Sequence, residues 1–190
     1  MTFKSHSIYV VVALCSVGGR CFLSADEPCK SGLQTGQRPG PYSAVQATGP
    51  QRGQSCCYIC ETADKPAAVI FARSLSDSLG KLVHEIDRAL PQFKASGLRA
   101  WVTFLSDDQP TLDAKVVKWS QDHAIRNVPL GVFEEASGPP SYRLAEDADV
   151  TVLLFVRQQV VLNFAFRTGE LTEARIAGIL KGLPQITTKK

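Results

Sequence analysis

The sequence predicts an α/β protein with a central mixed sheet, and three observations carry that prediction. Residues 67–72 (A-A-V-I-F-A) form a continuous apolar run that is too short for a solitary helix and fits a strand covered on both faces. Apolar residues at helical spacing, from Leu79 to Leu90, follow that strand directly. Near the C-terminus, apolar residues 151–156 and 160–166 are split by a short polar segment, which is typical of an antiparallel hairpin.

The other elements complete an alternating pattern along the chain. Ser74, Ser76 and Asp77 are candidate N-caps for the helix after the central strand, which is expected to end near Pro91. The remaining predicted elements are, in order, a short strand within residues 42–48, a strand over 98–105, a helix over 110–124 with Asp108 as N-cap, a strand over 128–133, and a last helix that begins near Leu171 or Thr172 and stops at Pro184. The order is therefore β-α-β-α-β followed by β-β-α.

The N-terminus has the pattern of a secretory signal peptide. A basic start is followed by a short apolar segment, residues 8–17, and by small residues that predict cleavage after Ala25. An apolar run this short does not span a bilayer, and no later stretch is long and apolar enough to do so. An uncleaved N-terminal anchor is the alternative. The sequence thus predicts an exported protein, periplasmic or secreted, with no membrane span after cleavage.

Charge gives no reason to expect a nucleic acid or an anionic lipid as partner. The formal net charge of the whole chain is +3. Residues 1–25 contain Lys4 and Arg20 and no acidic residue, so the exported chain is close to neutral. Residues 26–54 are rich in Gly, Pro, Gln and Ser and are predicted to be a flexible leader with one edge strand. Residues 55–187 form the predicted domain.

The order of elements resembles the thioredoxin-like fold, in the variant shared by peroxiredoxins and secreted TlpA-type thiol oxidoreductases. The resemblance covers roughly residues 42–186, and its most specific parts are V-I-F-A-R before a helix and A-D-V-T-V-L-L-F-V followed by V-V-L-N-F-A-F. It implies a three-layer α/β/α sandwich with a central mixed sheet and a C-terminal ββα unit.

The resemblance also implies where the reactive cysteines of such enzymes stand, and this chain has none there. Leu75 and Ser78 occupy the positions of the two cysteines at the start of the helix, and Val150 occupies that of the cis-proline. Peroxidase activity by the usual route is therefore not expected. The inherited groove, which in the family binds an extended peptide through backbone hydrogen bonds, would be formed by Leu75, Ser76, Asp77, Ser78, Asp149, Val150 and Thr151.

The four cysteines that remain after signal cleavage lie upstream of the central strand. Cys57 and Cys60 form a C-x-x-C in a predicted loop, and Cys29 and Cys56 are the other two. Three readings stay open. Cys57–Cys60 and Cys29–Cys56 bridges could pin the leader to the domain, Cys57 and Cys60 could be a relocated redox pair, or the cluster could bind a metal, although adjacent Cys56 and Cys57 suit one tetrahedral ion poorly.

Two functions of different classes follow from these patterns. The first is an exported thiol-disulfide oxidoreductase in which Cys57 and Cys60 exchange electrons with protein thiols. The second is a non-catalytic binding or scaffold module with structural disulfides that holds an extended peptide in the inherited groove. Neither requires a cofactor or a metal.

Overall fold

The structure is a computed structural model that describes residues 27–188 of the chain. The predicted signal peptide, with Cys15 and Cys21, lies outside the described residues. The strands are β1 (Ala44–Gln46), β2 (Ser55–Cys56), β3 (Ala67–Ala72), β4 (Arg99–Leu105), β5 (Leu130–Phe133), β6 (Val150–Val156) and β7 (Gln159–Phe166). The helices are α1 (Tyr58–Thr62), α2 (Asp77–Ala89), α3 (Gln109–Asp122) and α4 (Glu173–Thr187), with 3₁₀ turns η1 (Leu90–Ser96) and η2 (Pro140–Tyr142).

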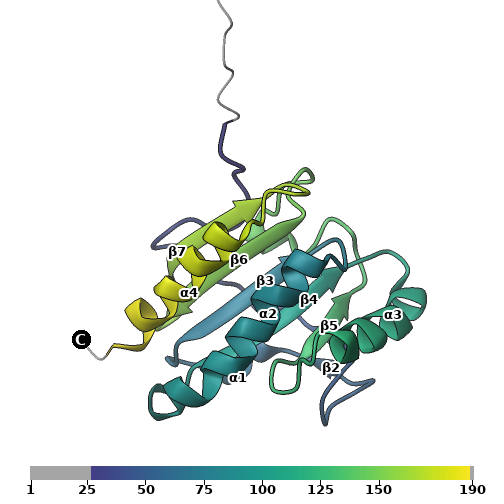
Figure 1. Cartoon of the computed structure of the whole chain (residues 1–190), viewed down its shortest axis with the longest axis horizontal. Coiled ribbons are helices and arrows are strands. Elements are labelled where there is room, and N and C mark those ends of the chain that lie inside the picture. Colours follow the sequence, from purple (N-terminus) through teal and green to yellow (C-terminus); the bar gives the residue numbers. More distant parts are fainter. Residues whose placement is uncertain (1–26, 189–190) are drawn as a thin grey trace, which may run out of the picture.

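The sheet is mixed, and its order is β2-β1-β5-β4-β3-β6-β7. Strands β3, β4 and β5 run parallel, as the crossovers through α2 and α3 require, while β6 pairs antiparallel with β3 and with β7 (Figure 1). All six residues of β3 are buried because the strand is central and both of its faces are covered. The predicted α/β class, the mixed sheet and the C-terminal ββα unit are confirmed.

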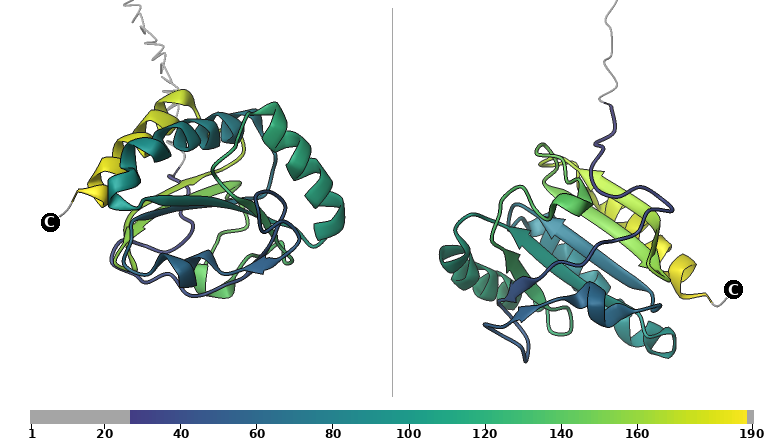
Figure 2. Two further views of the ribbon diagram at one scale, coloured as in Figure 1. Left: turned by 90° about the horizontal axis from the view of Figure 1, so that it is seen from below. Right: turned by 180° about the vertical axis from the view of Figure 1, so that it is seen from behind.

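The three long helices lie together on one face of the sheet (Figure 2, left). Ala68, Ile70 and Ala72 of β3 point toward them because alternate residues of a strand face the same side. The apolar stripes of α2, α3 and α4 pack there. They consist of Leu79, Leu82, Val83 and Ile86 from α2, Val116 and Trp119 from α3, and Ile176, Ile179, Leu183 and Ile186 from α4. This is the larger of the two apolar clusters.

The opposite face is covered by the leader, the short helix α1 and the turn η2 (Figure 2, right). Ala67, Val69 and Phe71 of β3 point into this second apolar cluster. The third layer of the sandwich thus consists mainly of extended chain, and no long helix of the described residues lies on this face. This face of the sheet is therefore shielded by the leader, by loops and by the short elements α1 and η2.

The leader makes more contacts than its Gly- and Pro-rich composition predicts. Leu33 is buried in the second cluster, and the Asn163 Nδ2 of β7 donates to the carbonyl oxygens of Ser31 and Leu33 at 2.8 and 2.7 Å. The backbone N–H of Gly36 donates to Val160 O, and Val160 N–H donates to Gln37 O. Farther along, Ala44–Gln46 enters the sheet between β2 and β5, so the strand is internal and not at the edge.

The three long helices begin at N-capping residues, as predicted, whereas α4 ends later than predicted. Ser76, Asp108 and Thr172 are the N-caps of α2, α3 and α4, each accepting a backbone N–H with its side-chain oxygen. The prediction that the last helix stops at Pro184 is wrong, because α4 continues to Thr187. Ile186 is buried against the sheet, and this packing offsets the hydrogen bond that the proline cannot donate.

Candidate redox site

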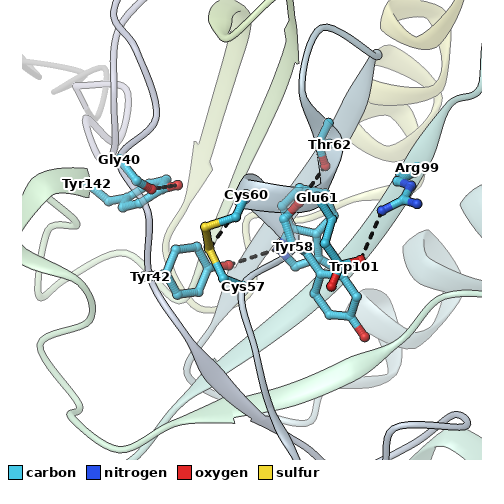
Figure 3. Close-up of a disulfide and its surroundings, with 10 residues drawn as sticks. All are labelled: Gly40, Tyr42, Cys57, Tyr58, Cys60, Glu61, Thr62, Arg99, Trp101 and Tyr142. Atoms are coloured by element: carbon cyan, nitrogen blue, oxygen red, sulfur yellow. Dashed lines mark hydrogen bonds and ion pairs between the residues drawn. A yellow bond between two sulfur atoms is a disulfide. The ribbon is translucent and has the colours of Figure 1, made fainter.

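Cys57 and Cys60 are joined by a disulfide in the first turn of α1, with their Cα atoms 5.4 Å apart (Figure 3). Cys57 is the N-cap, and its Sγ accepts the backbone N–H of Cys60 at 3.3 Å. The prediction that the C-x-x-C lies in a loop is therefore wrong, because the short helix α1 begins there. A five-residue helix gives no periodic signal in sequence, and cysteine is not a preferred N-cap residue, so no local pattern indicated this helix.

The two sulfur-bearing residues differ in exposure. Ile59 and Thr62 form the buried side of α1, and Cys57 is half-buried, packed against the second apolar cluster. Cys60 is exposed to solvent. The disulfide therefore presents Cys60 to the outside, while Cys57 lies toward the protein.

The helix α1 lies on the leader-covered face, near the start of β4. The ring of Tyr58 packs on that of Trp101, with centroids 5.6 Å apart, and Glu61 pairs with Arg99 at 3.2 Å (Figure 3). Arg99 is the first residue of β4, so the cysteines lie near the N-terminal ends of the parallel strands. The corner after β3, where the family's cysteines stand, is at their C-terminal ends. The predicted displacement of the C-x-x-C away from that corner agrees with this placement.

A buried polar network supports α1 from beneath. Trp101 Nε1 donates to the hydroxyl oxygen of Tyr42 at 2.9 Å, and that hydroxyl shares a 2.7 Å hydrogen bond with Thr103. The Tyr58 hydroxyl donates to Gln46 Oε1 at 2.9 Å. Burial raises the pKa of Tyr58 to about 12 and raises the pKa of Tyr42 further. Both phenols are therefore neutral hydrogen-bonding groups at neutral pH.

Cys29 and Cys56 are free thiols, so the predicted bridge between them is not formed. Cys56 lies in β2 at one edge of the sheet, whereas Cys29 lies close to Arg167, just beyond β7 at the other edge. Burial is the main cause that raises the pKa of both thiols, helped by Asp147 at Cys29 and by Glu61 at Cys56. Both thiols are therefore ionised less readily than an ordinary cysteine.

The corner after β3 is filled by the chain itself. The guanidinium of Arg73 donates to the carbonyl oxygens of Ala136, Ala145 and Ala148. Ser74 donates to Asp149 Oδ2 at 2.8 Å, which ties the start of α2 to the start of β6. No role was predicted for Arg73 from the sequence. Its position directly after a buried apolar strand was the available sign that its guanidinium would need hydrogen-bond partners within the protein.

The residues predicted for a peptide groove are brought together at this corner, but their binding groups are occupied. The backbone N–H of Asp149 donates to Phe166 O, and its C=O accepts from Arg73 N–H. Val150 is buried beneath the helices, and the Thr151 hydroxyl shares a 2.7 Å hydrogen bond with Ser31 of the leader. From α2, Ser76 is an N-cap, Ser78 contacts it at 3.3 Å, Leu75 packs on the larger cluster and Asp77 is exposed.

Two acidic residues and two histidines elsewhere have structural roles. Asp107 accepts the backbone N–H of Ala136 at 2.8 Å, and Asp108 caps α3. His84 Nδ1 lies 3.0 Å from His123 O, and the ring of His123 packs on Trp119. Within residues 27–188, no group of three or more His, Cys, Asp or Glu side chains is arranged to hold a metal ion.

A cavity of about 370 Å³ lies on the side of α1 that carries Tyr58 and Glu61. Its walls include Trp101, Arg99 and Leu98. A second cavity, of about 300 Å³, lies between α2 and α4 on the other face of the sheet, far from the disulfide. Only the first cavity adjoins the helix that carries the two bridged cysteines.

Known proteins resemble this chain in fold, whereas the comparisons of sequence found no match. No protein-family model matches the chain, and no curated protein matches it. Among solved structures, a proposed protein disulfide isomerase from Bacteroides thetaiotaomicron superposes with a TM-score of 0.62 at 15% identity, covering 84% of this chain and 94% of its own.

Two further structures match in the same way. The thioredoxin domain of a thiol-disulfide oxidoreductase from Bacteroides vulgatus has a TM-score of 0.58 at 14% identity, covering 80% of this chain and 99% of its own. A peroxiredoxin-like protein from Aquifex aeolicus has a TM-score of 0.52 at 15% identity, covering 80% of this chain and 88% of its own.

These matches and the sheet order define the class: the chain has the thioredoxin-like fold. Within that class, its own feature is a C-x-x-C disulfide carried on α1, before the central strand, in place of cysteines at the start of α2. None of the helices formed by residues 27–188 has the length and apolarity needed to cross a bilayer.

Proposed function

We propose that the protein is a thiol-disulfide oxidoreductase whose redox pair is Cys57 and Cys60. One observation carries this proposal: the disulfide lies within a single helical turn, one of its residues is exposed, and it bridges no two separate segments of the chain. An accessible sulfur is what an incoming thiolate requires.

The structural alternative explains this disulfide less well. In the chain-entropy model, closing the short loop from Cys57 to Cys60 stabilises the fold by about 2 kcal/mol, against about 3–4 kcal/mol for a bridge from Cys29 to Cys56. The leader is held by Asn163 and by backbone hydrogen bonds to β7, and not by a disulfide. The Cys57–Cys60 bond is therefore dispensable for pinning the leader.

The proposed reaction is a transfer of two electrons from a dithiol to a disulfide. A substrate dithiol is oxidised to a disulfide, the Cys57–Cys60 bond is reduced, and the two protons of the substrate thiols pass to the two protein sulfurs. The reverse reaction reduces a substrate disulfide. The cavity beside Tyr58 and Glu61 adjoins the helix α1, but neither Cys57 nor Cys60 lines it. The chemistry requires no metal and no organic cofactor.

Export is part of the same proposal. The N-terminal sequence pattern of a basic start, a short apolar segment and small residues before Asp26 supports it. Disulfide chemistry of this kind is compatible with an oxidising compartment such as the periplasm or the exterior of the cell. N-terminal sequencing of the protein recovered from cell fractions tests this point, and an intact residue 1 on a cytosolic protein contradicts it.

The exchange is tested with residues 26–190, which contain the sheet and both apolar clusters. The reduced protein is mixed with a fluorescence-quenched peptide that carries an internal disulfide, and the rate of peptide reduction is followed with glutathione as the recycling thiol. We expect turnover by the wild type and its loss in both Cys57→Ser and Cys60→Ser. Retention of the wild-type rate in either variant contradicts the proposal. The Cys29→Ser variant is the matched control and keeps the activity, because Cys29 is remote from α1.

A further inference from the structure

We infer that Cys60, the second cysteine of the C-x-x-C, is the sulfur that exchanges with substrates, and that Cys57 is the leaving and resolving sulfur. The inference rests on the proposed function and assigns the roles within that pair. It follows from three features of α1: the exposure of the two cysteines, the hydrogen bond to Cys57, and the state of the neighbouring thiol.

Access favours attack at Cys60. A thiolate attacks a disulfide sulfur through a mixed disulfide, and the rate depends on which sulfur it can reach. Cys60 is exposed, whereas Cys57 is half-buried and packs against the second apolar cluster. Figure 3 shows the bridge directed away from the Glu61–Arg99 ion pair, so that pair does not cover the exposed residue Cys60.

The leaving group also favours this order. When the S–S bond breaks after attack on Cys60, the electron pair stays on Cys57 Sγ. That atom already accepts the backbone N–H of Cys60 at 3.3 Å, and a hydrogen bond to the charged form stabilises a thiolate. Attack on Cys57 would instead leave the electron pair on Cys60 Sγ, which accepts no hydrogen bond within residues 27–188.

The nearest free thiol does not compete with Cys57 for this role. Cys56 is adjacent in sequence, but its side chain is buried and its S–H donates to Gln51 Oε1 at 3.3 Å. A protonated, buried thiol is a poor nucleophile. When the protein reduces a substrate disulfide, the thiolate that resolves the mixed disulfide at Cys60 is therefore that of Cys57.

A substrate dithiol is oxidised in two successive thiol-disulfide exchanges. A substrate thiolate forms a bond to Cys60 Sγ, the Cys57–Cys60 bond breaks, and Cys57 leaves as a thiolate and takes up a proton. The second substrate thiolate then attacks the substrate sulfur of the mixed disulfide, so that Cys60 leaves as a thiolate and the substrate becomes a disulfide. Cys60 is protonated in turn.

The order of attack is read from the site of the mixed disulfide. Oxidised wild-type protein, residues 26–190, is exposed briefly to reduced glutathione and quenched with N-ethylmaleimide, and the peptide that contains both cysteines is fragmented in the mass spectrometer. We expect glutathione on Cys60 and maleimide on Cys57. Glutathione on Cys57 overturns the inference.

A second measurement does not depend on the wild-type disulfide being reducible by glutathione. The single-thiol variants Cys57→Ser and Cys60→Ser, each in a Cys29→Ser and Cys56→Ala background, are reacted with an aromatic disulfide. The Cys57→Ser variant, which keeps Cys60, is expected to react about tenfold faster than the Cys60→Ser variant, which keeps Cys57, because Cys60 is the accessible thiol. The reverse ranking overturns the assignment. Failure of glutathione to reduce the wild-type bond at all, with this ranking intact, counts against the proposed function instead.

Discussion

The hydroxyl groups of Ser31 and Thr151 share a 2.7 Å hydrogen bond between residues 120 positions apart in the chain. Ser31 belongs to the leader and Thr151 to β6, next to the central strand, and both side chains are buried. Ser31 Oγ also accepts the backbone N–H of Ala145 at 3.0 Å. The leader is therefore fixed to the sheet by polar contacts. Its cysteine, Cys29, is a free thiol and contributes no bridge.

Asn163 is expected to be the main anchor of the leader. Replacing Asn163 with Ala removes the donors to Ser31 O and Leu33 O, and we expect a loss of about 1–3 kcal/mol in the free energy of unfolding because two carbonyl groups lose their partner. Urea denaturation measures this loss, and limited proteolysis reports faster cleavage of the leader. Gln159→Ala, at an exposed position of the same strand, is the control. Equal stability of the two variants contradicts this role.

Asp87 is expected to be the most sensitive acidic residue for stability. Its buried carboxylate accepts the backbone N–H groups of Arg126, Asn127 and Val128 and the Asn127 side chain, which fixes the loop before β5. Asp87→Ala should lower the free energy of unfolding by about 3 kcal/mol because these donors lose a charged partner. Glu85→Ala, on the same helix but in an exposed ion pair, should cost well under 1 kcal/mol. Similar losses for both would be the contrary result.

Alkaline pH is expected to destabilise the fold through Tyr58. Its folded pKa is raised to about 12 by burial, above the unfolded value of about 10. Because the folded state retains the proton longer, the stabilisation is complete below pH 10 and is lost as pH rises from about 10 to 12. Tyr58→Phe should reduce the slope of stability against pH in that window, as measured by urea denaturation at a series of pH values. An unchanged slope would show that the ring does not titrate differently in the two states.

Free thiols are expected at Cys29 and Cys56 in the oxidised protein. Denaturing residues 26–190 without reductant should release two titratable thiols, and the Cys29→Ser and Cys56→Ala double variant should lose less than about 2 kcal/mol in the free energy of unfolding. A bridge between these residues would give no thiols and a loss of about 2–4 kcal/mol on its removal. Non-reducing peptide mapping distinguishes the two cases directly.

The central strand, the helix that follows it and the C-terminal hairpin could be predicted because their signals are local. Ala67–Ala72 is apolar throughout, and Ser76 supplies the cap one residue before α2 begins. The end of α4 could not be predicted in the same way, since the burial of Ile186 overrides the local effect of Pro184.

The residues of the candidate site can be listed from the sequence, but their geometry cannot. The C-x-x-C and the vacant positions at Leu75 and Ser78 are visible in the sequence. The pairing of cysteines depends on which edge of the sheet each one reaches, and no local pattern separates Cys29 from Cys56 in that respect. The carboxylate of Asp87 and the guanidinium of Arg73 bind backbone groups about 40 to 75 residues away, which sequence spacing does not reveal.

The reduction potential of the Cys57–Cys60 bond tests the proposed function most directly. Residues 26–190 are equilibrated across a graded series of reduced and oxidised glutathione or dithiothreitol, alkylated, and analysed by intact mass. We predict a potential between about −120 and −270 mV, the range of proteins that exchange disulfides. A bond that stays oxidised below about −300 mV behaves as a structural disulfide and contradicts the account.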